Sequence, residues 1–292
     1  MDDLTALRGT ERRNCVDEWA LVLEASGLRP VVCRAPPGWQ LCVPADEAER
    51  ARIALETWER ENPRAEAPPT DPEVLDPHAI RHALAVAAAL LGLFLLTGAG
   101  RSDSIWFERG AADAVQVLDG EPWRVVTALT LHADLGHVVG NGVAGALFLA
   151  GVFRIFGLGV GAALVLAAGA LGNSLNAALR GSEHVVVGSS TAVFGALGLL
   201  AGRGLARGRA RGLQGRTAFL PVAAALALLA MIGTEGERVD FWAHGFGLGI
   251  GIALGAATCG AGTGRLAAPA LQRGAGALAL AVLAGAWLLA LR

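Results

Sequence analysis

The sequence contains no lysine and no tyrosine, so all 24 of its side chains counted as lysine or arginine are arginine. We attribute both absences to a biased genomic composition and not to function. The net charge is only -2, which gives no reason to expect a nucleic-acid partner. The four cysteines form no cluster with metal-ligand spacing, and the HExxH motif of one class of metalloproteases is absent. We therefore expect no metal and no cofactor.

Charged residues are scarce after residue 78, where alanine, glycine, leucine and valine form long runs. Hydrophobic residues make up 53% of the chain and the mean hydropathy is +0.48, which is too apolar for an ordinary soluble domain. Such runs predict an all-α polytopic membrane protein, and its 40 glycines would let the helices pack closely. The candidate spans are about 80–98, 137–156, 159–178, 186–203, 218–234, 239–258 and 274–291.

Residues 1–62 predict a small soluble α+β accessory domain. We expect a helix that ends at Gly27, two short strands around a Pro-Pro-Gly turn, and an amphipathic helix over residues 45–60. We assign this domain no chemistry. Residues 63–78 read as a proline-rich acidic linker to the membrane part.

The arginine-rich segment 203–216 indicates the orientation. It carries five arginines, so the positive-inside rule places it in the cytoplasm. Counting spans outward from it puts the N-terminus in the cytoplasm and the loops 99–136, 179–185 and 235–238 outside. We expect these arginines to set topology only; recognition of lipid head groups is the alternative.

Strongly polar side chains are rare in the predicted spans and gather at the start of three of them. The second, fourth and sixth spans open with LHADLGHVVGNG, VVVGSSTAVFGALG and DFWAHGFGLGIG. All three run from outside to inside, so these polar groups should share one depth near the outer face. They are His132, His137, Asn141, Ser189, Ser190 and His244.

This set of groups fits acyl transfer. A serine hydroxyl becomes a nucleophile when a base takes its proton, and His244 is the natural base. The side chains of His137 and Asn141, with the backbone N–H of Ser190, can donate to an oxyanion. No carboxylate falls at this depth in the three spans, so the pattern predicts a Ser–His dyad.

The same residues resemble the rhomboid family of intramembrane serine proteases. The similar motifs are Trp123-Arg124 with Thr127, the histidines and asparagine of the second span, Gly188-x-Ser190 with Phe194-Gly195, and AHxxGxxxG at 243–251. The resemblance covers about 79–258 and implies a rhomboid-like six-helix transmembrane bundle. The seventh span, in residues 259–292, is similar to an extended form of the family.

The resemblance implies Ser190 as nucleophile, His244 as general base, and His137 and Asn141 as oxyanion donors. The family has an aromatic-glycine pair four and five residues after its nucleophile, which favours Ser190 over Ser189. Phe194 shares a helix face with Ser190, so we expect its ring to pack on His244.

The remaining motif residues have supporting roles in this interpretation. Trp123 and Arg124 would belong to a lateral loop partly in the outer leaflet, and His132 would tie the outer loop to the span below. Gly247 and Gly251 would let the sixth span lie close to the fourth. Gly188 belongs to the serine motif itself.

The sequence departs from the family at Thr191, where the family usually has glycine; threonine is bulkier beside the oxyanion site but removes no catalytic group. The expected function is a serine endopeptidase of the inner bacterial membrane that cuts proteins with a transmembrane helix near the outer face. The alternative is an inactive rhomboid-like protein that binds transmembrane helices. A transporter would show inverted repeats, which we do not find. The sequence leaves the oligomeric state open.

Overall fold

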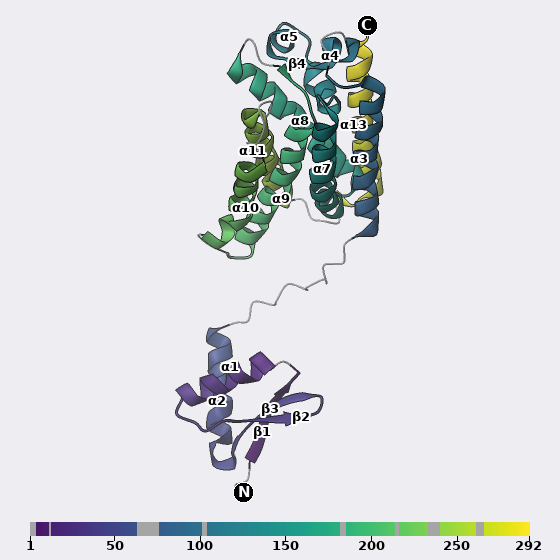
Figure 1. Cartoon of the computed structure of the whole chain (residues 1–292). Coiled ribbons are helices and arrows are strands. Elements are labelled where there is room, and N and C mark those ends of the chain that lie inside the picture. Colours follow the sequence, from purple (N-terminus) through teal and green to yellow (C-terminus); the bar gives the residue numbers. More distant parts are fainter. Residues whose placement is uncertain are drawn as a thin grey trace. The chain divides into compact units, whose positions relative to one another are not determined.

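The computed structural model describes residues 4–11, 13–62, 76–100, 104–181, 185–213, 216–232, 240–260 and 266–292. The chain divides into two units, residues 1–74 and 75–292, and each is treated by itself (Figure 1).

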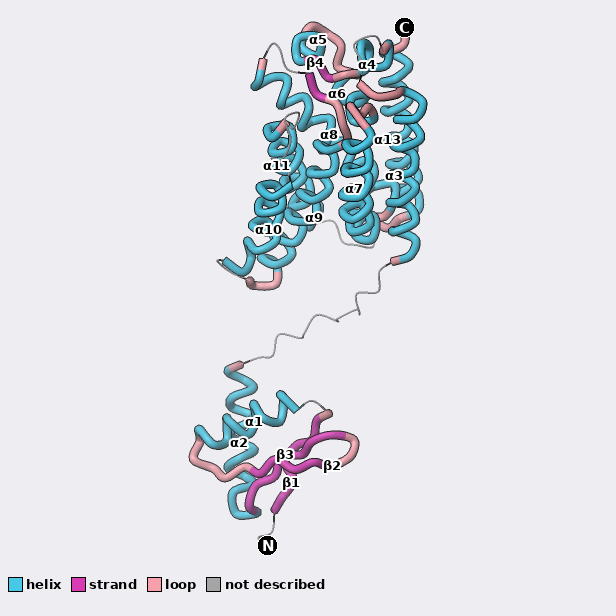
Figure 2. Tube along the Cα trace, viewed as in Figure 1, coloured by secondary structure: helices cyan, strands magenta, loops and turns pink. Residues whose placement is uncertain are grey.

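The N-terminal unit is a three-stranded antiparallel sheet with two helices (Figure 2). Its fully buried core includes Val16, Leu23, Leu41, Val43 and Leu55. The elements are β1 (Leu4–Thr10), α1 (Arg13–Ala25), β2 (Val31–Ala35), β3 (Gly38–Pro44), the single turn η1 (Ala45–Glu47) and α2 (Ala48–Glu61).

The predicted helix, strand pair and second helix of this unit are confirmed. The strand β1 was not predicted, because it is an edge strand whose side chains are only partly buried and show no strong apolar pattern. It pairs with β3, so the sheet order is β1-β3-β2.

The membrane unit is a bundle of long helices that lie side by side (Figures 1 and 2). Each of the seven predicted spans coincides with a helix. The helices are α3 (Pro77–Thr97), α7 (Leu135–Phe156), α8 (Leu158–Arg180), α9 (Ser190–Ala210), α10 (Arg216–Ile232), α11 (Phe241–Ala257) and α13 (Pro269–Ala290).

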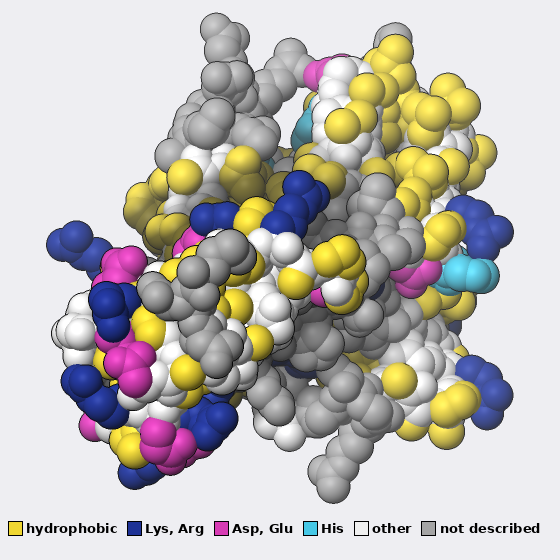
Figure 3. Space-filling model, turned by 90° about the horizontal axis from the view of Figure 1, so that it is seen from below, with side chains coloured by type: hydrophobic (Ala, Val, Ile, Leu, Met, Phe, Trp, Pro, Cys, Tyr) yellow, Lys and Arg dark blue, Asp and Glu magenta, His cyan; other side chains and the backbone are white. Residues whose placement is uncertain are grey.

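Among the described residues, five helices are long and apolar enough to cross a membrane: α3, α7, α8, α13, and α11 with the turn η3 (Thr258–Gly260) that follows it. In the described residues α10 has 17 residues, and the 21 residues of α9 include three arginines. Large apolar side chains, such as those of Leu95 on α3 and Leu280 on α13, are exposed on the outward faces of helices. In Figure 3 apolar side chains cover much of the helical bundle, whereas charged ones crowd the N-terminal unit.

The helix α9 is longer than the fourth predicted span, which ends near residue 203. The helix α9 continues to Ala210, and Arg203 is buried, with 3% of its surface exposed. Its guanidinium donates to the backbone oxygen of Thr258 at 3.1 Å and lies 5.1 Å over the ring of Phe156. A cation at this position stabilises the carbonyl end of α11, so Arg203 is a structural residue and not part of a charged loop.

The helices α9 and α11 pack face to face through glycines. A Cβ added to Gly247, Gly251 or Gly255 would lie 2.2 Å from the backbone oxygen of Thr191, Gly195 or Leu199 respectively. The pairing advances along both helices in the same direction, so α9 and α11 are parallel and start at the same end. The predicted approach of the sixth span to the fourth is confirmed.

The segment between α3 and α7 folds as short elements at one end of the bundle (Figure 1). It contains α4 (Ile105–Gly110), β4 (Ala112–Asp113), α5 (Ala114–Leu118), α6 (Arg124–Thr127) and the turn η2 (Ala128–Thr130). The strand β4 pairs with β5 (Val185–Val186), which comes just before α9. This pairing fixes the chain that leads into the two serines.

Candidate active site

The two serines lie where the chain turns into α9. Gly188 has a φ of +119°, which favours glycine, and its N–H donates to the backbone oxygen of Ala128 at 2.9 Å. Ser189 is the N-cap and Ser190 is the first residue of the helix. The first N–H groups of a helix have no partner within it and carry the positive end of its dipole. An anion is therefore favoured beside Ser190.

His137 and Asn141 lie one turn apart near the start of α7 and both face Gly188. A Cβ added to Gly188 would lie 2.6 Å from Cε1 and Nε2 of His137 and 3.4 Å from Nδ2 of Asn141. Asp134 fixes this end of α7, because its carboxylate accepts from the N–H of His137 at 2.8 Å. The structure thus brings both predicted donors against the residue that lies two positions before Ser190.

The amide of Asn141 is poised to donate. The residue is buried, with 8% of its surface exposed, and its Nδ2 has no hydrogen-bond partner within the described residues. A buried N–H group without an acceptor costs free energy, so such groups in a folded protein need an explanation. An oxygen that becomes negatively charged during a reaction would satisfy this group.

His244 lies in the first turn of α11 and is buried. The ring of Phe194 stacks on its imidazole, with 4.6 Å between the centroids and 28° between the planes. The contact that the spacing from Ser190 to Phe194 predicted is therefore present. The carbonyl of Thr191, the residue after Ser190, lies against Gly247. Since the two helices are parallel, Ser190 and His244 lie at the same end of the pair.

Thr191 is accommodated without crowding the donors of α7. Its side chain is fully buried, and its Cγ2 would lie 2.7 Å from a Cβ on Gly172 of α8 and 3.0 Å from one on Gly247 of α11. The extra bulk therefore occupies space that two glycines leave open. His137 and Asn141 approach from another side, at Gly188.

Ser189 has a partner of its own in His132. Its Oγ lies 3.2 Å from Nε2 of His132, and both residues are buried, whereas Ser190 is only half-buried. Burial, with a smaller contribution from the neighbouring His137, lowers the pKa of His132 to about 4. The ring of His132 also lies edge-on to that of His137, 5.2 Å between centroids. His132 therefore joins the segment before α7 to the start of α9, and not only to the span below it as predicted.

Trp123 and Arg124 lie in the segment between α3 and α7. Arg124 is buried and its guanidinium donates to the backbone oxygens of Glu108 and Ala111, at 2.9 and 3.0 Å. It also donates to the carboxylate of Glu121 at 2.5 Å. These bonds hold the short elements of the segment together. Trp123 is the half-buried N-cap of α6.

Two buried asparagines of α8 were not singled out from the sequence. Asn173 donates to the backbone oxygen of Val125 at 3.0 Å, and Asn176 donates to the carboxylate of Asp240 at 2.6 Å. Asp240 caps α11, the helix of His244. The available signal was the presence of strongly polar amides in an apolar run, which usually marks a function or a necessary contact.

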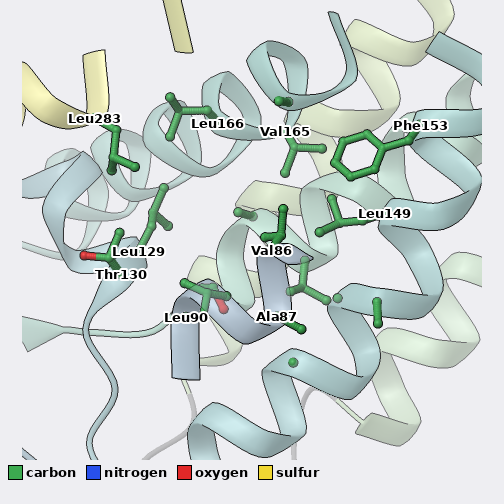
Figure 4. Close-up of a pocket in the computed structure, with 17 residues that line it drawn as sticks. Val86, Ala87, Leu90, Leu129, Thr130, Leu149, Phe153, Val165, Leu166 and Leu283 are labelled. Atoms are coloured by element: carbon green, nitrogen blue, oxygen red, sulfur yellow. The ribbon is translucent and has the colours of Figure 1, made fainter. Parts of the chain in front are cut away.

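An apolar cavity of about 170 Å³ lies on the other side of the start of α9. Figure 4 shows Val86 and Leu90 of α3, Leu149 of α7 and Val165 of α8 around it. Ser189, Ala192 and Val193 of α9 also line it. Its walls offer almost no polar group, so the cavity holds no set of side chains suited to acid-base or nucleophilic chemistry.

The chain is similar to known proteins over this region. Residues 119–261 match the sequence profile of the Rhomboid domain. The chain is 28% identical to the candidate rhomboid protease YdcA of Bacillus subtilis (strain 168) over 159 residues, 54% of this chain and 78% of that protein. It is 32% identical to the rhomboid protease GluP of the same organism over 119 residues, 40% of this chain and 23% of that protein.

Proposed function

Because the chain belongs to the rhomboid family, we propose that it is an active intramembrane serine endopeptidase with Ser190 as nucleophile and His244 as general base. The observation that carries this proposal is the buried amide of Asn141, which has no acceptor in the described residues and lies beside Gly188 at the start of α9. Buried donors in folded proteins usually have an acceptor, so an unmet donor beside the start of α9 supports a role in binding an oxyanion.

The reaction proceeds in two halves. His244 takes the proton from Oγ of Ser190 as that oxygen attacks the carbonyl carbon of the peptide bond, and a tetrahedral intermediate forms. The amide of Asn141, the imidazole of His137 and the backbone N–H of Ser190 donate to its oxyanion. The protonated His244 then gives its proton to the leaving amine, and an acyl-enzyme on Ser190 remains.

The second half repeats the first with water. His244 removes a proton from the water molecule that attacks the acyl carbon, and the same three donors stabilise the second oxyanion. The collapse of this intermediate returns the proton to Ser190 and releases the carboxylate product. No group outside this set is required for the balance of protons.

The substrates that we propose are membrane proteins with a transmembrane helix, cut within or near that helix on the outer side. We place the protein in the bacterial inner membrane with its N-terminal unit in the cytoplasm. Arg207, Arg209, Arg211 and Arg216, around the end of α9 and the start of α10, support this orientation even though Arg203 is buried.

Cleavage of a single-span substrate in detergent or proteoliposomes tests the proposal, with Ser190→Ala and Ser189→Ala as the matched variants. We expect Ser190→Ala to abolish cleavage and Ser189→Ala to retain most of it. An inactive family member that binds helices would bind the substrate and leave it intact in wild type as well. Gly172 and Gly247 leave space for Thr191, so its departure from the family's usual glycine gives no argument for this alternative.

A further inference from the structure

The buried amide of Asn176 connects two helices of the bundle. Asn176 lies in α8 with 1% of its surface exposed, and its Nδ2 donates to Oδ2 of Asp240 at 2.6 Å. Its amide oxygen has no hydrogen-bond partner in the described residues. A buried amide in an apolar helix costs free energy unless its bonds compensate, so the bond to Asp240 is the contact that explains this residue.

Asp240 in turn fixes the first turn of α11. Its carboxylate accepts from the N–H groups of Trp242 and Ala243, at 3.1 and 3.2 Å. Its backbone oxygen accepts from the N–H of His244 at 3.1 Å. A carboxylate at this position also interacts favourably with the helix dipole. The position of His244 therefore follows the position of Asp240.

The start of α11 needs such an anchor because the helix is rich in glycine. After His244 every second residue is glycine, at Gly245, Gly247 and Gly249, and glycine lowers the stability of a helix by about 1 kcal/mol per residue relative to alanine. The ring of Phe194 stacks on one face of the imidazole. Asn176 supplies a restraint from a third helix, α8.

We propose that Asn176 and Asp240 form a positioning pair that holds His244 in line with Ser190. The proposal rests on the function proposed above, in which His244 is the base. Neither residue of the pair needs to touch the substrate. Loss of the pair should slow the chemical step, because a displacement of about 1 Å in a catalytic group can cost about 100-fold in rate.

The chain offers a matched control in Asn173, one turn earlier on α8. Asn173 is buried to the same degree, with 2% of its surface exposed, and its amide oxygen likewise has no partner in the described residues. It also donates one hydrogen bond, but to the backbone oxygen of Val125 in α6. Leucine at either position therefore removes one hydrogen bond donated by a buried amide of α8.

The first test measures kcat and KM for a single-span substrate with the full chain carrying Asn176→Leu or Asn173→Leu. We expect Asn176→Leu to lower kcat by about 10- to 100-fold with little change in KM, and Asn173→Leu to have a much smaller effect on kcat. Equal losses in the two variants would overturn the proposal, because they would reflect general packing of α8. Cleavage by wild type in the same assay shows that the proposed function holds. Failure of this proposal can then be told apart from failure of that function.

The second test exchanges the two groups and stays informative if Asn176→Leu does not fold. Asn176→Asp alone sets two carboxylates against each other and should lower kcat. The double variant Asn176→Asp with Asp240→Asn restores the hydrogen bond with donor and acceptor exchanged, and asparagine also caps helices well. We expect the exchange to recover most of the wild-type kcat. A double variant no faster than Asn176→Asp would overturn the proposal.

Discussion

The ring of Phe194 stacks on the imidazole of His244, with 4.6 Å between the two ring centroids. Phe194 stands one turn after Ser190 on α9, and His244 stands in the first turn of the parallel helix α11. The stack restricts how the imidazole can turn, so the helix that carries the proposed nucleophile also orients the proposed base.

Replacing this ring should slow turnover without unfolding the protein. Phe194→Leu keeps apolar bulk but removes the stack, which is worth about 1 kcal/mol, so we expect kcat to fall by about 3- to 10-fold. Phe194→Tyr keeps the ring and serves as the control, with most of the turnover retained. Equal losses in the two variants, measured with a single-span substrate, would show that the stack does not orient His244.

The glycine contact between α9 and α11 can be tested with two neighbouring glycines. A Cβ at Gly247 would lie 2.2 Å from the backbone oxygen of Thr191, whereas one at Gly245 would meet no atom within 4 Å. We expect Gly247→Ala to lower the midpoint of thermal unfolding and cleavage together. Gly245→Ala should leave the fold intact or stabilise it slightly, because alanine favours helix. A Gly247→Ala protein as stable and active as wild type would contradict the close contact.

Sequence patterns predicted most of the fold because each pattern has a local cause. Apolar runs marked the seven long helices described in the membrane unit, and the Pro-Pro-Gly turn marked the pair β2 and β3. The strand β1 and the end of α9 were missed because tertiary contacts decide them. β1 is held by its pairing with β3. Arg203 can be buried within α9 because its guanidinium donates to the backbone oxygen of Thr258 and lies over the ring of Phe156.

The site was predictable to the extent that its residues form motifs. The spacing from Ser190 to Phe194 predicted the stack on His244, and the turns of α7 predicted that His137 and Asn141 share a face. The bond from Asn176 to Asp240 joins residues 64 positions apart, and the pairing of Ser189 with His132 joins residues 57 apart. No local pattern specifies such contacts, since they depend on how the helices dock.

The low pKa of His132, about 4, gives the stability of the protein a pH dependence. An unfolded histidine has a pKa near 6.5, so between pH 6.5 and 4 the unfolded chain binds more protons than the folded one. As the pH falls from about 6.5 to about 4, the titration of His132 should therefore lower the free energy of unfolding by up to roughly 3 kcal/mol. Above about pH 6.5 it should have no such effect.

Thermal unfolding of wild type and His132→Gln across this pH range measures that contribution. The difference in stability between the two proteins should shrink toward pH 4, because glutamine does not titrate. A difference that stayed constant from pH 7 to pH 4 would contradict the assignment of a neutral, buried His132.

Removing the proposed oxyanion donor should affect turnover and not binding. Asn141→Ala deletes one donor, and the loss is typically about 100- to 1000-fold in kcat, with a smaller loss expected here because two donors remain. KM should change little. A thermal melt must accompany the assay, and unchanged kcat in a folded variant would mean that Asn141 is only structural.

The central claim is that Ser190 is an activated nucleophile, and reaction with a fluorophosphonate tests it most directly. The probe phosphonylates a serine only when a neighbouring base activates it, so peptide mass spectrometry can locate the adduct. We predict one adduct on Ser190 in wild type and in Ser189→Ala, and none in Ser190→Ala or His244→Ala. An adduct on Ser189, or labelling of Ser190 that persists in folded His244→Ala, would contradict the account.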